Sequence, residues 1–399
     1  MPGKTAVKKI LLVNEFYTPY GNGGAERSVQ HLAESLVSAG HDVVVACTAP
    51  ESSVDVVNGV KVYYLKFKST HGPFTDRHSY VYKRFWDIRD IYNLATGRTM
   101  GKILDKEKPD VVHTNNITGF SIALWHEVRK RNLRLVHTLR DYYLLCPRNS
   151  MFRQGKNCLK QCLSCKLISA FKKRSTHRVD CVIGVSQYIL DRHLQYGRFK
   201  GVPNCVIHNI YERNTPLFSK DFCNYIKIGF IGRLVPEKGV NFLIQAFCNP
   251  DVQSLSSLVI AGDGPLDYVE NLKSKARTAK ASIEFLGFVA PEKFYARVDT
   301  VVIPSLWHEP LSRVVLEAFA HGIPVIASER GGMPEIIDEG RTGFLFDPDD
   351  PSSLVNVLKG LTQSNGSKLE LAKNCLNKAK QFSSEYIIDQ YLNIYFSAR

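Results

Sequence analysis

Long apolar runs are absent from this 399-residue sequence. No stretch approaches the roughly 20 consecutive apolar residues that a membrane-spanning helix needs. The apolar run at residues 10–13 is too short for the core of a secretory signal, so we expect it to form a first strand and the protein to be cytoplasmic. Low-complexity tracts are lacking too, and the content of 44% hydrophobic and 23% charged residues is typical of a folded globular protein.

The ten cysteines are not expected to form a disulfide framework, because disulfides are rare in cytoplasmic proteins. The paired C-x2-C knuckles of strong zinc motifs are also missing. Four cysteines nevertheless recur with the spacing C-x11-C-x3-C-x2-C, and nearby basic residues favour their thiolate forms. Two interpretations stay open: small core residues, or a structural zinc ion or iron–sulfur cluster bound by Cys146, Cys158, Cys162 and Cys165.

Acidic residues are absent between positions 142 and 179, where nine Lys and Arg residues occur. Residues 1–200 hold 32 Lys and Arg against 16 Asp and Glu, whereas residues 201–399 hold 20 against 22. Residues 166–178 interleave apolar and basic side chains as an interfacial helix does, which favours an anionic membrane surface as a partner. A solvated face or a patch for a soluble anionic glycan is the alternative. Nucleic acid is not expected, because no recognition-helix, RNA-binding-sheet or zinc-finger signature is present.

The order of strand-like and helix-like segments predicts the α/β class with two Rossmann-like, doubly wound domains that face a central cleft. Short apolar runs alternate with amphipathic segments up to a polar stretch near residues 203–220, and the alternation restarts at YIKIGFIGRL. We expect an N-terminal, acceptor-side domain over 1–210 with the basic, cysteine-containing insert 142–179, a C-terminal domain over 211–380, and a helix over 381–399 that packs back on the N-terminal domain. Ligands of such sheets bind at the carboxyl ends of the strands.

The first strand leads into a glycine-rich turn and a helix, in the segment GNGGAERSV. The dinucleotide fingerprint G-x-G-x-x-G is lacking here. Gly23, Gly24 and Glu26 nevertheless form a turn at a helix amino terminus, which suits a phosphate or a polar acceptor group. An ordinary strand-to-helix turn is an equally good interpretation.

The equivalent loop of the second domain carries two cations. Arg233 follows a strand directly, and Lys238 stands five residues later at the entrance to a helix. Both can reach the cleft, where they would neutralise a diphosphate. Two solvated surface charges are the alternative.

Two glutamates lie in the stretch HEPLSRVVLEAFAHGIPVIAS. Its apolar spacing predicts a helix that starts near Leu311, with Glu309 just before it. Glu317 would lie within this helix, and its side chain would lean back toward the amino end. Both carboxylates would then border one small volume, which the backbone amides of Leu311 and Ser312 also face. The alternatives are a surface ion pair between Arg313 and Glu317 and a helix-dipole role for Glu309.

A second glycine-rich loop follows the next expected strand, in the segment ERGGMPEII. Gly331 and Gly332 allow a close approach of the backbone, and Glu335 is expected to open the next helix.

Taken together, five segments resemble the family-4 retaining glycosyltransferases, whose GT-B fold consists of two Rossmann domains. They are GGAER at 23–27, GRLVPEKG at 232–239, AGDGP at 261–265, the Glu309/Glu317 pair and GGMPE at 331–335. The resemblance runs from about Ile10 to Phe346. It implies a nucleotide-sugar donor as substrate, with UDP the commonest nucleotide, no required cofactor or metal, and a lipid-linked or oligosaccharide acceptor in cell-surface polysaccharide or lipopolysaccharide assembly.

The resemblance also implies roles for individual residues. Arg233 and Lys238 would hold the diphosphate, Glu317 the ribose hydroxyls, and Glu309 the donor sugar near its anomeric carbon. Further donor contacts are expected from Leu311, Ser312, Gly232, Gly262 and Glu335. One position departs from the family: Arg140 stands before Asp141 where many relatives have a histidine, so we keep Arg140 as a candidate catalytic residue that can donate hydrogen bonds but cannot act as a base.

Other functions are weighed against this one. A non-catalytic protein that binds nucleotide-sugars or polyanions is favoured only by Arg140. A nucleotide-sugar epimerase shares the fold but lacks the context of the two glutamates, and a glycogen-type phosphorylase would need a much longer chain. The basic first half predicts a peripheral position on the inner face of the cytoplasmic membrane.

Overall fold

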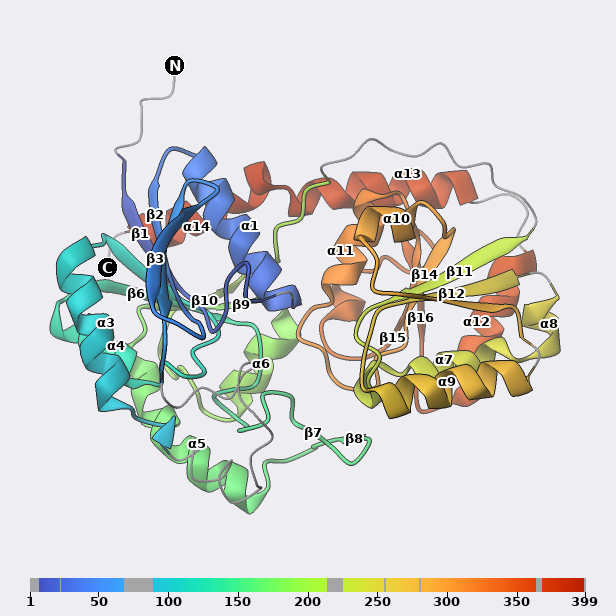
Figure 1. Cartoon of the computed structure of the whole chain (residues 1–399), viewed down its shortest axis with the longest axis horizontal. Coiled ribbons are helices and arrows are strands. Elements are labelled where there is room, and N and C mark those ends of the chain that lie inside the picture. The colour runs from blue at the N-terminus through green and yellow to red at the C-terminus, as the bar shows by residue number, and fades with distance from the viewer. Residues whose placement is uncertain are drawn as a thin grey trace. The chain divides into compact units, whose positions relative to one another are not determined.

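The computed structural model describes residues 7–21, 23–67, 89–213, 225–254, 256–279, 281–363 and 368–397. The chain divides into two compact units (Figure 1). Unit 1 comprises Met1–Met151, Cys158–Ile210 and Ser384–Arg399, and unit 2 comprises Phe152–Asn157 and Tyr211–Ser383. Each unit contains a largely parallel sheet with helices on its faces, which confirms the predicted class of two Rossmann-like α/β domains.

Unit 1 is built around a sheet that, within the described residues, has eight strands in the order β10-β9-β6-β5-β1-β2-β4-β3. The strands are β1 (Lys9–Val13), β2 (Asp42–Thr48), β3 (Ser53–Val57), β4 (Val60–Leu65), β5 (Val111–Thr114), β6 (Arg134–Leu139), β9 (Cys181–Gly184) and β10 (Asn204–Val206). The helices are α1 (Gly24–Ser38), α3 (Leu94–Glu107), α4 (Ala123–Lys130), α5 (Leu163–Ser175), the 3-10 turn η1 (Thr176–Arg178), α6 (Gln187–Gln195) and α14 (Ser384–Phe396).

The strands of this sheet run parallel except β3, which pairs antiparallel with β4 at the edge. Strands such as β1 and β2 are apolar at nearly every position because helices cover both faces of the sheet. The strand order reverses between β1 and β5, the position at whose carboxyl ends sheets of this kind bind their ligands.

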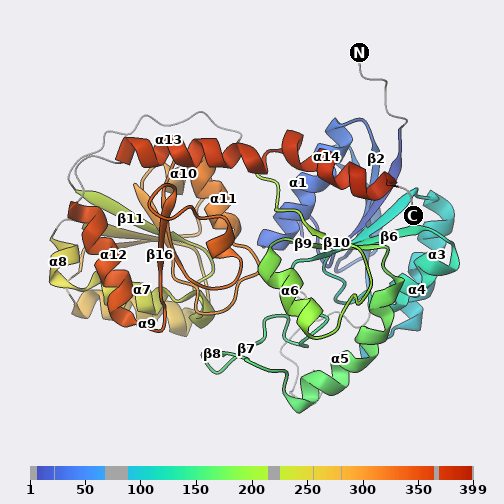
Figure 2. The ribbon, with the colours of Figure 1, turned by 180° about the vertical axis from the view of Figure 1, so that it is seen from behind.

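The C-terminal helix α14 is an integral part of unit 1 (Figure 2). Tyr391 and Tyr395 are buried in the same core cluster as the residues of β1, β2 and α1. The Tyr395 hydroxyl lies 2.7 Å from Nδ1 of His113, and Nε2 of the same imidazole lies 2.7 Å from Thr138 Oγ1. Burial lowers the pKa of His113 well below its usual range, so the ring stays neutral and joins α14 to β5 through one hydrogen bond and β5 to β6 through the other.

Unit 2 contains a sheet that is parallel throughout and, among the described residues, has six strands in the order β13-β12-β11-β14-β15-β16. The strands are β11 (Ile226–Ile231), β12 (Ser256–Ala261), β13 (Ile283–Gly287), β14 (Thr300–Ile303), β15 (Val325–Ser328) and β16 (Gly343–Phe346). The helices are η2 (Pro236–Lys238), α7 (Val240–Phe247), α8 (Pro250–Gln253), α9 (Leu266–Thr278), α10 (Pro291–Tyr295), α11 (Arg313–Ala320), η3 (Met333–Glu335), α12 (Pro351–Gln363), α13 (Lys368–Ala379) and η4 (Lys380–Phe382). Here the order reverses between β11 and β14, so a ligand is expected at the carboxyl ends of those strands.

A short hairpin from the first half of the chain belongs to unit 2. It consists of the antiparallel strands β7 (Phe152–Arg153) and β8 (Lys156–Asn157). This differs from the expectation that the whole insert 142–179 belongs to the N-terminal domain. The physical reason is a pair of hydrogen bonds from the Asn157 side chain to the backbone of Leu306 and His308 in unit 2.

None of the helices in the part of the chain that the structure describes is both long and apolar enough to cross a lipid bilayer.

Candidate functional site

The candidate site of unit 2 lies where β11, β12, β14 and β15 end. These strands are parallel neighbours in the sheet, so their carboxyl ends share one edge. The loops at this edge carry the predicted donor-site residues Gly232, Arg233, Lys238, Gly262, Glu309, Leu311, Ser312 and Glu335. The loop after β11, with Arg233 and Lys238, and the loop after β14, with Glu309, flank the point where the strand order reverses.

Lys238 and Glu309 meet directly. The Lys238 Nζ donates to Glu309 Oε1 at 2.6 Å, and the Ser305 hydroxyl donates to Oε2 of the same carboxylate at 2.8 Å. Both charged side chains are mostly buried. Charged partners at this distance form one of the stronger hydrogen bonds in proteins, so each member holds the other in place.

The backbone of Glu309 is held as closely as its side chain. The Gly332 N–H donates to the Glu309 carbonyl at 2.9 Å. Gly331 has a φ of +62°, and a Cβ at this position would lie 1.9 Å from the same carbonyl oxygen. Only glycine fits there, which agrees with the close backbone approach expected for this loop.

A second close approach joins the loops after β11 and β12. A Cβ on Gly262 would lie 1.8 Å from the carbonyl oxygen of Gly232, and Gly262 has a φ of +131°. The backbones of the two loops therefore pass each other without side chains between them, next to Arg233. Arg233 itself is exposed, and its guanidinium lies 4.0 Å from the Glu237 carboxylate. An exposed pair at that distance contributes little, so the guanidinium is not held by it.

Glu317 lies inside α11 and is buried. Its Oε1 accepts from Arg313 Nε at 2.9 Å, and its Oε2 accepts from the Tyr295 hydroxyl at 2.9 Å. Burial, together with the Glu317 charge, raises the pKa of Tyr295 well above its usual range, so the phenol stays a donor. The ion pair between Arg313 and Glu317 that the alternative interpretation expects is thus present, but it is buried and does not lie on the surface. Each carboxylate oxygen has two lone pairs, so Glu317 retains capacity to accept sugar hydroxyls, and that role stays a prediction.

The start of α11 differs from the expectation. The helix begins at Arg313, with Ser312 as its N-cap residue in an extended conformation, two residues later than the apolar spacing indicates. Leu311 and Ser312 are buried in the preceding loop. Glu335 is exposed and ends the 3-10 turn η3, so it does not open a helix as expected.

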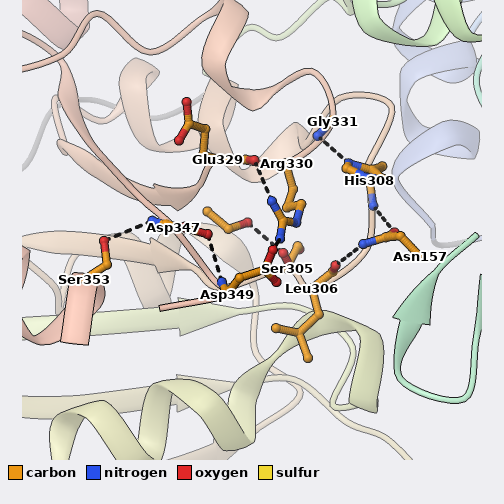
Figure 3. A network of polar contacts seen from close by, with 11 residues as sticks. Asn157, Ser305, Leu306, His308, Glu329, Arg330, Gly331, Asp347, Asp349 and Ser353 are labelled. Atoms are coloured by element: carbon orange, nitrogen blue, oxygen red, sulfur yellow. Dashed lines mark hydrogen bonds and ion pairs between the residues drawn. The ribbon is translucent and has the colours of Figure 1, made fainter. Parts of the chain in front are cut away.

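Asn157 belongs to this region, although no sequence motif marks it as a candidate site residue. Its Nδ2 donates to the Leu306 carbonyl at 2.7 Å, and its Oδ1 accepts from the His308 N–H at 3.0 Å (Figure 3). The Gly331 N–H lies 3.4 Å from His308 Nδ1. The loop just before Glu309 is therefore tied to the hairpin β7–β8 on one side and to the loop after β15 on the other.

In unit 1, the glycine-rich turn lies at the amino end of α1 as expected. Gly23 is the N-cap residue, and Glu26 is in the first turn. A Cβ on Gly23 would lie 2.3 Å from Oε2 of Glu26, and a Cβ on Gly21 would lie 2.6 Å from its Cγ. The Glu26 side chain therefore covers the turn, and its negative charge disfavours a phosphate at this helix end.

Arg140 follows β6 in unit 1 and is partly buried. Its Nε donates to Asn115 Oδ1 at 2.8 Å, and its Nη1 donates to Asn209 Oδ1. Three residues earlier, His137 lies in the core, with Nδ1 2.9 Å from Thr114 Oγ1, and burial lowers its pKa to about 3. His137 is thus a buried strand residue whose ring contacts a neighbouring strand.

Three of the four cysteines of the insert, Cys146, Cys162 and Cys165, lie near one another. The Cys146 and Cys165 sulfurs are 3.8 Å apart, while Cys162 Sγ lies 3.2 Å from Ser164 Oγ. Hydrogen bonding to Cys165 lowers the pKa of Cys146 to about 6. No three of the described His, Cys, Asp and Glu residues form a group that could hold a metal ion in this arrangement. A zinc ion or iron–sulfur cluster bound by Cys146, Cys158, Cys162 and Cys165 stays a prediction.

Known proteins resemble this chain in sequence and in fold. A family model described as "Glycosyltransferase Family 4" matches residues 22–213, and one described as "Glycosyl transferases group 1" matches residues 225–364. An uncharacterized 42.6 kDa protein in the cps region of Klebsiella pneumoniae is 33% identical over 97% of this chain and 99% of its own length.

Solved structures share the fold at lower identity. The sucrose-phosphate synthase of Thermosynechococcus elongatus superposes with a TM-score of 0.76 at 20% identity, covering 97% of this chain and 98% of that chain. The Anabaena protein HepE, in complex with UDP and glucose, superposes with a TM-score of 0.73 at 21% identity, covering 98% of this chain and 100% of that chain.

Proposed function

The chain belongs to the family-4 glycosyltransferases of the GT-B fold, and on that premise we propose that it transfers a sugar from a UDP-sugar to a lipid-linked or glycan acceptor during cell-surface polysaccharide assembly. The observation that carries this proposal is the Lys238–Glu309 pair at the point where the unit 2 strand order reverses. It brings an ammonium group, which suits a phosphate, and a carboxylate, which suits a hydroxyl, to one place.

Lys238 and Glu309 neutralise each other. A buried charge without a partner would be costly, so each member of the pair stabilises the other. An incoming diphosphate offers the ammonium a second anion and draws it from the carboxylate. Glu309 Oε1 is then free to accept a hydroxyl of the donor sugar, so donor binding itself switches the carboxylate from its internal partner to the substrate.

The same cations supply the electrostatic stabilisation that the reaction needs. As the bond to the sugar breaks, negative charge grows on the diphosphate, and Lys238 with the exposed Arg233 is suited to stabilise it. We propose that no metal is required for this step and that transfer proceeds with retention. The departing phosphate oxygen takes the proton of the acceptor hydroxyl on the same face of the sugar, and the new bond forms where the old one breaks.

UDP is the proposed nucleotide because the structurally similar protein HepE was solved in complex with UDP and glucose. The surface-polysaccharide setting is supported by the cps-region relative from Klebsiella pneumoniae.

Unit 1 is the proposed acceptor unit. The Glu26 carboxylate over the α1 turn suits hydroxyl groups of a sugar better than a phosphate. Arg140, held by two asparagine side chains, provides a donor of fixed charge after β6. The proposed setting is the cytoplasm, at the inner face of the cytoplasmic membrane, where the excess positive charge of residues 1–200 would be attracted to anionic lipids.

Calorimetric titration with UDP, GDP and ADP, with EDTA present, tests the proposed donor site. We expect one nucleotide to bind, and the Arg233→Ala variant to bind it at least about tenfold more weakly, the loss of one charged hydrogen bond. Arg297→Ala is the matched control, because Arg297 is an exposed arginine of unit 2 that precedes the amino end of β14 and pairs with Glu284. Binding of no nucleotide, or equal binding by Arg233→Ala, would contradict the proposal.

A further inference from the structure

Helix α5 has its apolar side chains on the outside. Both views show the helix at the outside of unit 1 (Figures 1 and 2). Leu163, Leu167 and Phe171 are four residues apart, so they lie on one face. The exposed fractions are 74% for Leu163, 63% for Leu167, 61% for Phe171, and 82% for Leu159 just before the helix. A surface helix of a globular protein ordinarily turns such a stripe toward the core.

The face of α5 that turns toward unit 1 is polar. Ser169 and Lys172, which lie opposite Leu167 around the helix, are both buried. The Lys172 Nζ donates to the Tyr143 carbonyl at 3.2 Å and lies 3.1 Å from the centre of the Tyr143 ring. The Ser169 Oγ accepts from Gln161 at 3.0 Å and from Arg198 at 2.8 Å.

These contacts determine which face of α5 turns outward. Rotating the helix to bury its leucines would take the buried Lys172 ammonium group from its contacts with Tyr143 and the buried Arg198 guanidinium from Ser169, and proteins strongly avoid buried charges that lose hydrogen bonds. The exposed apolar stripe is therefore a consequence of specific contacts on the other face. An exposed group of large apolar side chains of this kind marks an interaction surface.

The charges around the stripe are of one sign. Arg174 continues the face of Leu167, Lys166 and Lys173 border it, and Lys160 precedes the helix, and all four are exposed. Acidic residues are absent throughout residues 142–179. The complementary partner is an apolar surface rimmed by negative charge, because a second copy of this helix would bring like charges together.

We propose that Leu159, Leu163, Leu167 and Phe171, with the four surrounding basic residues, dock onto an anionic lipid bilayer. The helix would lie in the plane of the interface, with its stripe among the acyl chains and its ammonium and guanidinium groups at the lipid phosphates. This inference rests on the membrane setting of the proposed function and names the surface that docks, and docking itself needs neither nucleotide nor acceptor. It also brings unit 1, the proposed acceptor unit, to the surface where a lipid-linked acceptor would reside.

Co-sedimentation of the full chain with vesicles of phosphatidylcholine, with or without phosphatidylglycerol, tests the inference. We expect the chain to bind the vesicles that contain phosphatidylglycerol and to release them at high salt, because surface charge attraction is screened. The triple variant Leu163→Ser, Leu167→Ser, Phe171→Ser and the double variant Lys166→Glu, Arg174→Glu should each bind at least about tenfold more weakly, since both the apolar and the charged contributions are needed.

The matched control is Val54→Ser with Val56→Ser, because these two valines are exposed apolar residues on β3 of the same unit. It should bind vesicles as the wild type does. Unchanged circular dichroism and nucleotide affinity would show that the variants fold, so a failure of the donor site and a failure of docking are distinguishable. Equal vesicle binding by all variants would overturn the inference. So would a wild type that ignores anionic vesicles but forms a dimer, or captures a protein, that the triple variant loses.

Discussion

Replacing Asn157 tests whether the hairpin β7–β8 positions the loop before Glu309. Asn157→Ala removes the donor to the Leu306 carbonyl, at 2.7 Å, and the acceptor for the His308 N–H, at 3.0 Å. Each hydrogen bond contributes about 0.5–1.5 kcal/mol net, so the loop would lose about 1–3 kcal/mol of restraint. If the productive position of Glu309 depends on that restraint, the rate of transfer falls by about 5- to 150-fold.

The assay is nucleotide release from the donor at saturating and at limiting concentration. We expect kcat to fall while the affinity for the free nucleotide stays within about twofold, because Asn157 bonds to the loop after β14, whereas Arg233 lies in the loop after β11. Asn157→Asp should be at least as impaired as Asn157→Ala, since a carboxylate would face the Leu306 carbonyl oxygen. This separation of kcat from nucleotide affinity is a readout that mere loss of stability would not produce.

Gln154→Asn is the matched control. Gln154 is exposed in the same hairpin with a φ of +52°, a conformation that asparagine adopts readily. It should keep the wild-type kcat. A wild-type kcat in Asn157→Ala, or equal losses in Asn157→Ala and Gln154→Asn, would refute the argument that the Asn157 side chain positions the loop.

Three further predictions concern single residues. Burial alone would raise the pKa of Glu107, but hydrogen bonds, of which the one from Lys61 makes the largest contribution, outweigh burial and lower the pKa to about 2. Glu107→Gln should therefore lower the unfolding free energy by about 2 kcal/mol at pH 7. Because the folded pKa is depressed, this difference from the wild type should shrink as pH falls from about 4.5 to about 2, which urea titration at several pH values measures. Glu317→Gln leaves the buried Arg313 without its anion and should lower the unfolding free energy by about 3 kcal/mol in the same assay, whereas an unchanged value would contradict the buried pair. Gly331→Ala places a Cβ 1.9 Å from the Glu309 carbonyl oxygen and should lower kcat at least about tenfold, and wild-type turnover would contradict that close approach.

The fold class could be predicted because parallel strands covered on both faces are apolar at nearly every position. Runs such as KILLV in β1 and DVVVACT in β2 therefore stand out between amphipathic helices. The positions of the site loops follow from that pattern, since each loop simply continues a strand. The first residue of α11 could not be predicted, because Leu311 is buried in the preceding loop and continues the apolar spacing of the helix beyond its amino end.

Contacts between distant parts of the chain could not be predicted. Asn157 lies in a segment that reads as a polar turn, and its partners are about 150 positions away, so local propensity carries no information about them. The interleaved apolar and basic residues of 166–178 predicted an interfacial helix. The same pattern did not distinguish Lys172, which is buried and determines the orientation of α5, from the exposed basic residues around it. Periodicity identifies the two faces of a helix, and only tertiary partners decide which of them is buried.

The proposed function is the transfer of a sugar from a nucleotide donor through a site that contains Glu309. Its most direct test is to incubate the purified chain with a panel of labelled UDP-sugars and membranes that contain lipid-linked acceptors, with EDTA present, and to follow the label into the lipid or glycan fraction. We expect the wild type to transfer label from one donor, and Glu309→Gln to bind UDP normally while transferring at least about 100-fold more slowly. Tight UDP binding by the wild type with no transfer from any donor, or full transfer by Glu309→Gln, would contradict the account.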